Sequence, residues 1–587
     1  MLSTTVCTQS QMPPRGRLTL SDSFVAVGLT LLGFSWLVTE HFLPWVSWHS
    51  EVVAFSAVVL LCWVALARCL QIKPPMLIAV PWLSLPFAGL TAVAVVQFAV
   101  GTITFFGDVM TVGLYCALCI ACVVLGFNTN GMQVNGYWAA REQRPVQWLA
   151  IVIAVGAFAS AIAGFVQVLG LWEESAWIVR MYEMRRAGGN LGQPNQMATL
   201  LVMGGASVTY LHASKKIGVG LSLLTLFVLC LGLAATESRT GALGLMALLL
   251  WWQLKRRNVA DEISKWAAPA VGFGFLILFL IWPAFLNSMR LFDSVVENRF
   301  SLGDVRLALW SQLLEAISQH PLWGWGVLQV AEAHNAVAHA YQVNNPFSYS
   351  HNLVLDLAVW VGLPVTIFGV GIAVTWLTRR CQQTVSLVPW YALAVAVPMI
   401  VHSMLEFPFA YAYFLAPLMY LLGVLERSSG AKTLIWINSK AVGLAVFVLS
   451  GVLVWSSVEY LAIEEDFRIV RFEQLRIGNT PVGQPRPAVI LFTQLGALLS
   501  GSRIEVTPAM SPEHLEQLKR LALRYPWVAT QYRYALALAL NGNSREAVRQ
   551  FQIIRWQQDE KLYQKIKREL RELAQSRYPE LRTLELP

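Results

Sequence analysis

The sequence predicts an all-α, polytopic membrane protein with about thirteen transmembrane helices. Of its 587 residues, 56% are hydrophobic and only 13% are charged, whereas charged residues make up about 25% of a soluble domain. The hydrophobic residues gather in runs near the length that crosses a bilayer, and Lys and Arg flank every second connection between runs. These observations exclude an ordinary soluble globular protein.

The apolar runs that predict these helices cover most of the chain up to residue 462. In chain order they are 24–46, 52–70, 76–100, 109–126, 147–171, 196–212, 217–236, 240–253, 267–286, 353–378, 388–405, 407–425 and 440–462. The first run is long and lacks a small-residue cleavage site, so we interpret it as a helix rather than a signal peptide.

Basic residues remain preferentially on the cytoplasmic side of short loops, so their distribution predicts the orientation of the chain. With the N-terminus inside, the connections 47–51, 101–108 and 403–408 are exported and contain no Lys or Arg. The basic connections carry Arg15, Arg17, Arg68, Lys73, Arg141, Arg144, Lys215, Lys216, Lys255, Arg256, Arg257, Arg379, Arg380, Arg427 and Lys432. An odd number of spans exports residues 463–587. The net charge of +9 follows from this bias, so we expect membrane lipids and no nucleic acid as partners.

The eight cysteines predict neither a disulfide framework nor a metal site. Cys116, Cys119 and Cys122 repeat along an apolar run that offers no His or carboxylate beside them. Small packing residues explain this spacing better than metal ligands do.

Three connections that should be exported nevertheless contain arginines, at 172–195, 235–241 and 287–352. Arginine suits phosphate because its planar guanidinium stays charged and donates two parallel hydrogen bonds. Arg239, in a tight turn between two apolar runs, therefore indicates a phosphorylated lipid headgroup, while Arg180 and Arg290 fit a general attraction to anionic lipid equally well.

The stretch GGNLGQPNQMATLL, residues 188–201, places glycines and amide side chains directly before an apolar run. Its glycines allow backbone amides to face outward, and a helix that begins near Gln196 adds the positive end of its dipole. Together with Arg185 and Arg186, these groups form a candidate phosphate cradle. The alternative is a simple helix entry that is capped by Asn190 or Asn195.

Two further segments have helical spacing outside the apolar runs. Residues 303–319 place Leu307, Trp310, Leu313, Leu314 and Ile317 on one face, which predicts an amphipathic helix over the site opening or on the membrane surface. Residues 534–551 resemble one tetratricopeptide unit, and helices near 512–524 and 558–576 should complete a small helical domain. Residues 478–511 are expected to be irregular.

Five stretches, in this order along the chain, resemble a known family. They are GGNLGQPNQMATLL (188–201), ESRTGALGL (237–245), RLALWSQLLEAISQHPLWGWGV (306–327), YSHNLVLDLAVWVGLPV (349–365) and HSMLEFPFAYAYF (402–414). The sequence is similar to PglL-type protein O-oligosaccharyltransferases of the O-antigen ligase and polymerase superfamily.

The resemblance implies a GT-C-like glycosyltransferase in the bacterial inner membrane, with its active site on the periplasmic face and without a cofactor or metal. Such an enzyme transfers an oligosaccharide from undecaprenyl diphosphate to Ser or Thr of exported proteins such as pilin. Attachment of O-antigen to lipid A core and glycan polymerisation remain alternatives within the superfamily. A transporter or flippase is the alternative outside it.

The resemblance also implies roles for individual residues. The histidine of the YSHN stretch, His351, should accept the acceptor's proton, and Asn352, Tyr349 or a carboxylate would orient its ring. His402 and Glu406 are four residues apart; either Glu406 orients a histidine or holds a sugar, or the two side chains pair with each other. The candidate binding residues for lipid diphosphate and glycan are Arg185, Arg186, Asn190, Gln193, Asn195, Arg239, Arg299, Arg306 and Tyr349.

The expected domain organisation follows from these motifs. It comprises N-terminal membrane helices (1–178), a catalytic membrane region with a large exported loop (179–425, loop 287–352), a last membrane helix (426–462) and a C-terminal helical domain (463–587).

Overall fold

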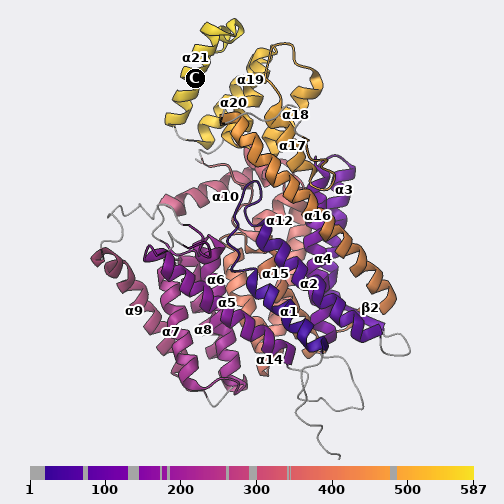
Figure 1. The fold of residues 1–587 in the computed structure, drawn as a ribbon, viewed down its shortest axis with the longest axis vertical. Helices are drawn as coiled ribbons and strands as arrows, with labels where there is room; N and C mark the ends of the chain where they lie inside the picture. The colour runs from indigo at the N-terminus through magenta and orange to yellow at the C-terminus, as the bar shows by residue number, and fades with distance from the viewer. Residues whose placement is uncertain are drawn as a thin grey trace, which may run out of the picture.

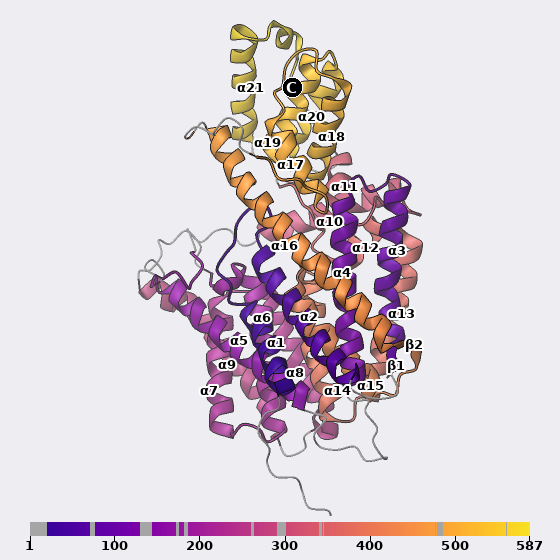
Figure 2. The same cartoon turned by 45° about the vertical axis from the view of Figure 1, so that its right-hand side comes forward.

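The chain folds into an upright helical bundle with a small helical domain on one end (Figure 1). The computed structural model describes residues 20–70, 77–129, 144–171, 175–180, 186–259, 263–289, 301–339, 343, 345–475, 477, 485–558 and 560–586. We call the end of the bundle that carries the C-terminal helices the domain face. Figure 2 shows that two short strands, β1 (Leu77–Pro81) and β2 (Thr433–Asn438), lie at the opposite end.

The bundle is built from helices that overlap the predicted apolar runs. They are α1 (Leu20–Phe34), α2 (Trp48–Leu70), α3 (Leu85–Ala99), α4 (Phe106–Thr129), α5 (Arg144–Val168), α6 (Pro194–Ala213), α7 (Val219–Ala235), α8 (Arg239–Val259), α9 (Ala267–Ser288), α12 (Leu353–Val361), α13 (Leu363–Gln383), α14 (Leu387–Ser403), α15 (Ala412–Ser428) and α16 (Ser439–Leu475). Among the described residues, six helices are long and apolar enough to cross a membrane by length and composition. A multi-pass membrane protein is therefore supported, and the larger number of spans stays a prediction.

Two predicted spans are interrupted. The run 353–378 divides at Gly362, whose φ of +81° is a backbone conformation that favours glycine. A Cβ there would lie 2.4 Å from the carbonyl oxygen of Leu322, so the segment around Leu322 packs directly against the break. The first run, 24–46, is helical only as far as Phe34.

The expectation of a purely α-helical chain is wrong in one place. Strand β1 (Leu77–Pro81) pairs antiparallel with β2 (Thr433–Asn438), and Leu77 lies opposite Asn438. Both segments are short and rich in β-branched or aromatic residues, and Pro81 ends the first one, which favours a two-stranded ladder over a helix.

Helix α16 joins the bundle to the C-terminal domain. It contains 37 residues and runs from β2 along the outside of the bundle to the domain (Figure 2). The predicted boundary at residue 462 therefore falls inside a continuous helix.

The C-terminal domain contains α17 (Thr493–Arg503), α18 (Pro512–Arg524), α19 (Val528–Leu540), α20 (Ser544–Gln557) and α21 (Glu560–Ser576). Helices α19 and α20 meet at the predicted turn, where Gly542 has φ +80°, and Ala547 and Phe551 are fully buried. Helix α17 contradicts the expectation of an irregular segment over 478–511. Gly and Ser residues weaken the helical pattern in its sequence, but Leu495, Leu498 and Leu499 share one face and are buried against α16.

Helices α10 (Ser301–Gln319) and α11 (Val330–Ala336) lie between the bundle and the domain. The predicted amphipathic helix is confirmed as α10, but the predicted apolar face is only partly correct. Leu313 and Ile317 are buried, whereas Leu307 and Leu314 are more than half exposed. Leu309 and Ala316 complete the buried face instead, because they lie on the same side of the helix as Leu313.

Candidate active site

His351 occupies a tight turn that directly precedes α12. Its φ of +60° is rare for a residue with a side chain, and such strain persists where neighbouring contacts enforce it. Here Asn352 Oδ1 accepts hydrogen bonds from the amides of Val354 and Leu355, which caps α12. The Ser350 amide donates to Asp356 Oδ1 at 2.7 Å, so both sides of the turn are fixed.

The His351 ring is oriented by a carboxylate. Its Nδ1 lies 2.6 Å from Glu406 Oε2, and the edges of Phe347 and Phe407 pack against the ring. A carboxylate accepts the Nδ1 proton, so a neutral ring keeps its lone pair on Nε2. Within the described part of the chain, Nε2 has no hydrogen-bond partner. This is the arrangement of a general base with an orienting carboxylate.

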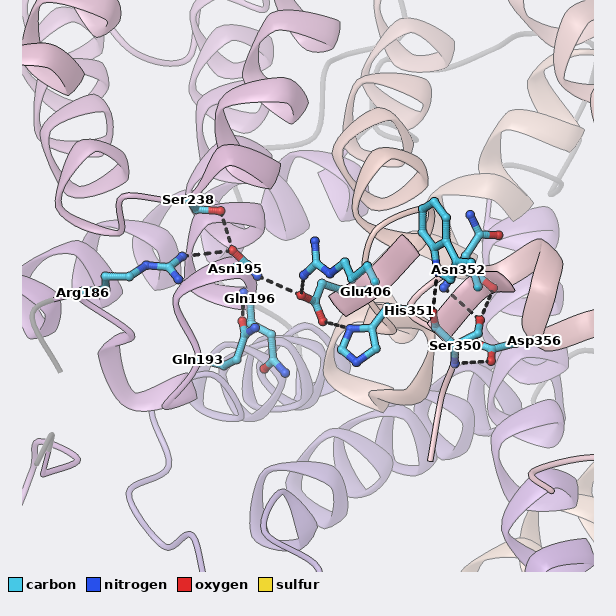
Figure 3. Close-up of polar contacts among 12 residues, drawn as sticks. Arg186, Gln193, Asn195, Gln196, Ser238, Ser350, His351, Asn352, Asp356 and Glu406 are labelled. Carbon is cyan, nitrogen blue, oxygen red and sulfur yellow. Dashed lines mark hydrogen bonds and ion pairs between the residues drawn. The ribbon is translucent and has the colours of Figure 1, made fainter. Parts of the chain in front are cut away.

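Glu406 collects donors from three distant segments, as Figure 3 shows for His351 and Asn195. Besides His351, Asn195 Nδ2 donates to Oε1 at 3.2 Å, and Arg306 Nη2 also donates to Oε1. Burial raises the pKa of this carboxyl, but the hydrogen bond from His351 and the charge of Arg306 outweigh burial and leave the pKa below its usual value. Glu406 is therefore held as a carboxylate.

His402 and Glu406 do not pair through their side chains. Helix α14 ends at Ser403, so the two residues do not share a continuous helical face. The buried His402 ring instead bonds through Nδ1 to Thr199 Oγ1 at 2.8 Å. Of the two readings of this pair, the structure fits the one in which Glu406 orients a histidine, and that histidine is His351.

Asn195 extends the polar contacts toward a second arginine. Its Oδ1 accepts from Arg186 Nη2 at 3.3 Å and from Ser238 Oγ at 2.7 Å (Figure 3). Arg186 also donates through Nε to the Thr236 carbonyl. Arg239 follows Ser238 and is exposed at the start of α8. Arg186 and Arg306 thus contact one polar cluster, and Arg239 is the next residue in the chain after its member Ser238. Arg185 and Arg299 lie outside the described residues.

The prediction that the glycine amides face outward is wrong. The amides of Gly188 and Gly189 donate to Gln167 Oε1 at 3.2 and 2.8 Å, inside the bundle. Gln193, rather than either asparagine, caps α6, since its Oε1 accepts from the Gln196 amide at 2.6 Å. Buried Gln167 satisfies these amides locally, which the motif itself does not reveal.

Asn190 and Tyr349 also differ from their expected roles. Asn190 is buried, and its side chain hydrogen-bonds to the backbone of Leu37, Trp177 and Val179. Both of its side-chain polar atoms are therefore used in holding the fold together. The ring of Tyr349 stacks on Phe407 with centroids 4.6 Å apart and so supports the aromatic wall beside His351. Among the described residues, neither Tyr349 nor Asn352 hydrogen-bonds to the His351 ring, since Asn352 caps α12. We remove Asn190 from the candidate ligand set.

Sequence reasoning missed Gln167, Thr199 and Ser238. Ser238 lies inside the motif ESRTGALGL, but nothing in the spacing of that motif predicts that its hydroxyl contacts Asn195. Gln167 and Thr199 lie in apolar runs. A single polar side chain in a membrane span indicates a buried hydrogen bond, and this signal could have identified both residues. Among the described residues, no three His, Cys, Asp or Glu side chains are grouped to hold a metal ion.

Comparison with known proteins places these motifs in families. The family described as "Protein glycosylation ligase" matches residues 187–212, "O-Antigen ligase" matches 224–370, and "Virulence factor membrane-bound polymerase, C-terminal" matches 390–570. These matches confirm the predicted resemblance to PglL-type proteins of the O-antigen ligase superfamily.

Two curated relatives agree with this assignment. The chain is 25% identical over 536 residues to a general O-oligosaccharyltransferase of Acinetobacter baylyi, covering 89% of this chain and 90% of the relative. It is 24% identical over 453 residues to a ComP-specific O-oligosaccharyltransferase of the same organism, covering 75% and 78% of the two chains. The predicted enzyme class, a glycosyltransferase, is confirmed by these relatives.

Proposed function

We propose that this PglL-type chain transfers an oligosaccharide from undecaprenyl diphosphate to a Ser or Thr hydroxyl of exported proteins, with pilin as one candidate acceptor. The observation that carries the proposal is the His351–Glu406 pair, in which Nε2 is left to accept a proton beside Arg306. Both curated relatives are named O-oligosaccharyltransferases, which supports the same reaction class.

In the proposed step, the acceptor oxygen forms a bond to the anomeric carbon while the bond from that carbon to the diphosphate oxygen breaks. The hydroxyl proton moves to His351 Nε2, and the lipid diphosphate leaves with the bonding electron pair. Glu406 stabilises the imidazolium that forms, because its pKa is held low and it stays charged.

The arginines at the site suit the leaving group. Arg186 and Arg306 come from separate segments and contact the Asn195–Glu406 cluster, and exposed Arg239 follows Ser238 in the chain. The departing diphosphate gains negative charge, so fixed guanidinium groups beside it stabilise the transition state more than the bound donor. Arg185 and Arg299 remain predicted members of this set.

We further propose that the domain face is periplasmic in the inner membrane. Helix α10, which carries Arg306, helix α12, which follows His351, and the C-terminal domain lie toward this end (Figure 2). The basic connections predict that the opposite end is cytoplasmic. Cysteine labelling at exposed Arg545 in intact cells tests this: a membrane-impermeant reagent should modify an R545C variant.

The function itself is tested by intact-mass analysis of exported proteins. Cells that carry this chain and a lipid-linked glycan should produce proteins heavier by one glycan, and cells with His351→Ala should produce none at equal levels of membrane-inserted protein. Glycan addition by the His351→Ala variant at the wild-type level would reject the proposal.

A second function is favoured by the match of residues 224–370 to O-antigen ligases, namely transfer of the same donor glycan to lipid A core. The same cells decide between the two acceptors. Modified lipopolysaccharide without modified protein would replace a protein acceptor by a lipid one.

A further inference from the structure

A buried ion pair fastens the C-terminal domain to the bundle. Arg524, the last residue of α18, donates through Nε and Nη2 to both oxygens of Asp108 in the first turn of α4, with N···O distances between 2.7 and 3.2 Å. The side chains are 15% and 1% exposed. A buried carboxylate that loses its cation is strongly unfavourable, so this contact fixes where the domain sits.

The same carboxylate holds the beginning of α11. Gln329, which directly precedes α11, donates through Nε2 to Asp108 Oδ2 at 3.2 Å. Near the end of α11, buried Asn335 donates to Gln531 Oε1 of α19 at 3.3 Å. The short helix is therefore tied at one end to the docking carboxylate and at the other to the domain itself.

Helix α11 in turn contacts the segment that leads to His351. The buried ring of His334 bonds through Nδ1 to Gln312 of α10 at 2.7 Å and through Nε2 to the Asn345 carbonyl at 3.2 Å. Phe347 meets the His334 ring and the His351 ring edge-on, with centroid separations of 6.0 and 5.4 Å. Three contacts thus link the domain to the His351 ring: Gln531 with Asn335, His334 with Phe347, and Phe347 with His351.

We propose that α11 is the element through which the docked C-terminal domain holds His351 in its reactive orientation, with Arg524 and Gln531 as positioning residues. This inference rests on the proposed function and gives the domain a part in the chemical step. A domain that only recruits acceptor proteins would instead affect acceptor binding.

The test combines hydrogen exchange with kinetics on the full-length protein in lipid nanodiscs. Arg524→Gln should speed amide exchange across 345–353 by about tenfold, because α11 loses its anchor. It should also lower kcat about tenfold at saturating donor and acceptor, with the acceptor KM unchanged. Arg520→Gln is the matched control: that arginine lies one turn earlier on α18, is exposed, and pairs with Glu516 of the same helix.

Arg524→Gln leaves the Asp108 charge buried without its cation, and this variant could fail to fold for that reason. The double variant Asp108→Asn with Arg524→Gln removes the unpaired charge, so it tests the same contact without that penalty. The inference is overturned if exchange changes in either variant stay within 97–108, 321–329 and 518–531, or if only the acceptor KM rises. Arg524→Lys should recover part of kcat, since it restores a charge to the carboxylate. If the wild type transfers no glycan, the proposed function fails, while the exchange data still decide whether the domain is coupled to His351.

Discussion

Two polar regions of the bundle, both predicted from the sequence to hold functional groups, are used differently in the structure. In the stretch 188–193, the amides and side chains are satisfied by close neighbours, above all by Gln167 and by the cap from Gln193. Around Glu406, the partners come from far along the chain, and His351 keeps one ring nitrogen without a partner in the described structure. We infer that a polar region can take part in a reaction where one of its reactive atoms has no hydrogen-bond partner within the fold.

The largest effect that would sharpen this comparison is expected from Glu406→Gln. A neutral amide cannot stabilise the imidazolium, so kcat should fall about 10²- to 10³-fold while the donor KM changes little. Steady-state transfer to a purified acceptor measures this. Glu426→Gln is the matched control, since it also removes a buried carboxylate that pairs with an arginine, Arg380, but on α15 away from the cluster.

A fall in kcat of less than about three-fold for Glu406→Gln would contradict this comparison. The residues around Glu406 would then have a structural role, like the glycine stretch.

A smaller effect is expected from Asn195→Ala. This change removes one donor to Glu406 and the bridge to Arg186 and Ser238, while the His351 contact with Glu406 remains. We expect kcat/KM for the lipid-linked donor to fall about tenfold, as one hydrogen bond to a charged group contributes roughly 1.5 to 3 kcal/mol. An unchanged kcat/KM would place Asn195 outside the reaction.

For the other region, Gln167→Ala should affect stability and not chemistry. The two glycine amides would lose their buried acceptor, at a cost of about 1–3 kcal/mol. Thermal unfolding in detergent should show a lower midpoint, whereas kcat per folded molecule should stay near the wild-type value. A selective loss of kcat without a change in midpoint would contradict the division between the two regions.

The smallest expected effect concerns pH. Burial lowers the pKa of His334 to about 4, partly offset by its hydrogen bond to the Asn345 carbonyl. The unfolded chain binds this proton near pH 6.5, so folding stability falls as the pH drops from about 6.5 to about 4. His334→Asn should remove that part of the slope. Unfolding midpoints of both proteins at several pH values measure it, and parallel curves would refute the assignment.

Sequence alone predicted the elements that follow from composition and motif. The apolar runs, the amphipathic α10 and the helix pair around Gly542 could be read from local patterns, and His351 was singled out by the family resemblance. The partner of His351 was left open, because Glu406 reaches it only after α14 ends at Ser403 and the chain turns. The β1–β2 pair and the Asp108–Arg524 contact also join distant segments, which no local period encodes.

The most direct test of the central claim is chemical rescue of His351→Ala by imidazole in proteoliposomes that contain a lipid-linked donor and an acceptor protein. If His351 Nε2 takes the acceptor's proton, the variant should transfer at least about 10²-fold more slowly than wild type, and its rate should rise with the concentration of neutral imidazole. A variant that transfers glycan at the wild-type rate without imidazole would contradict the account.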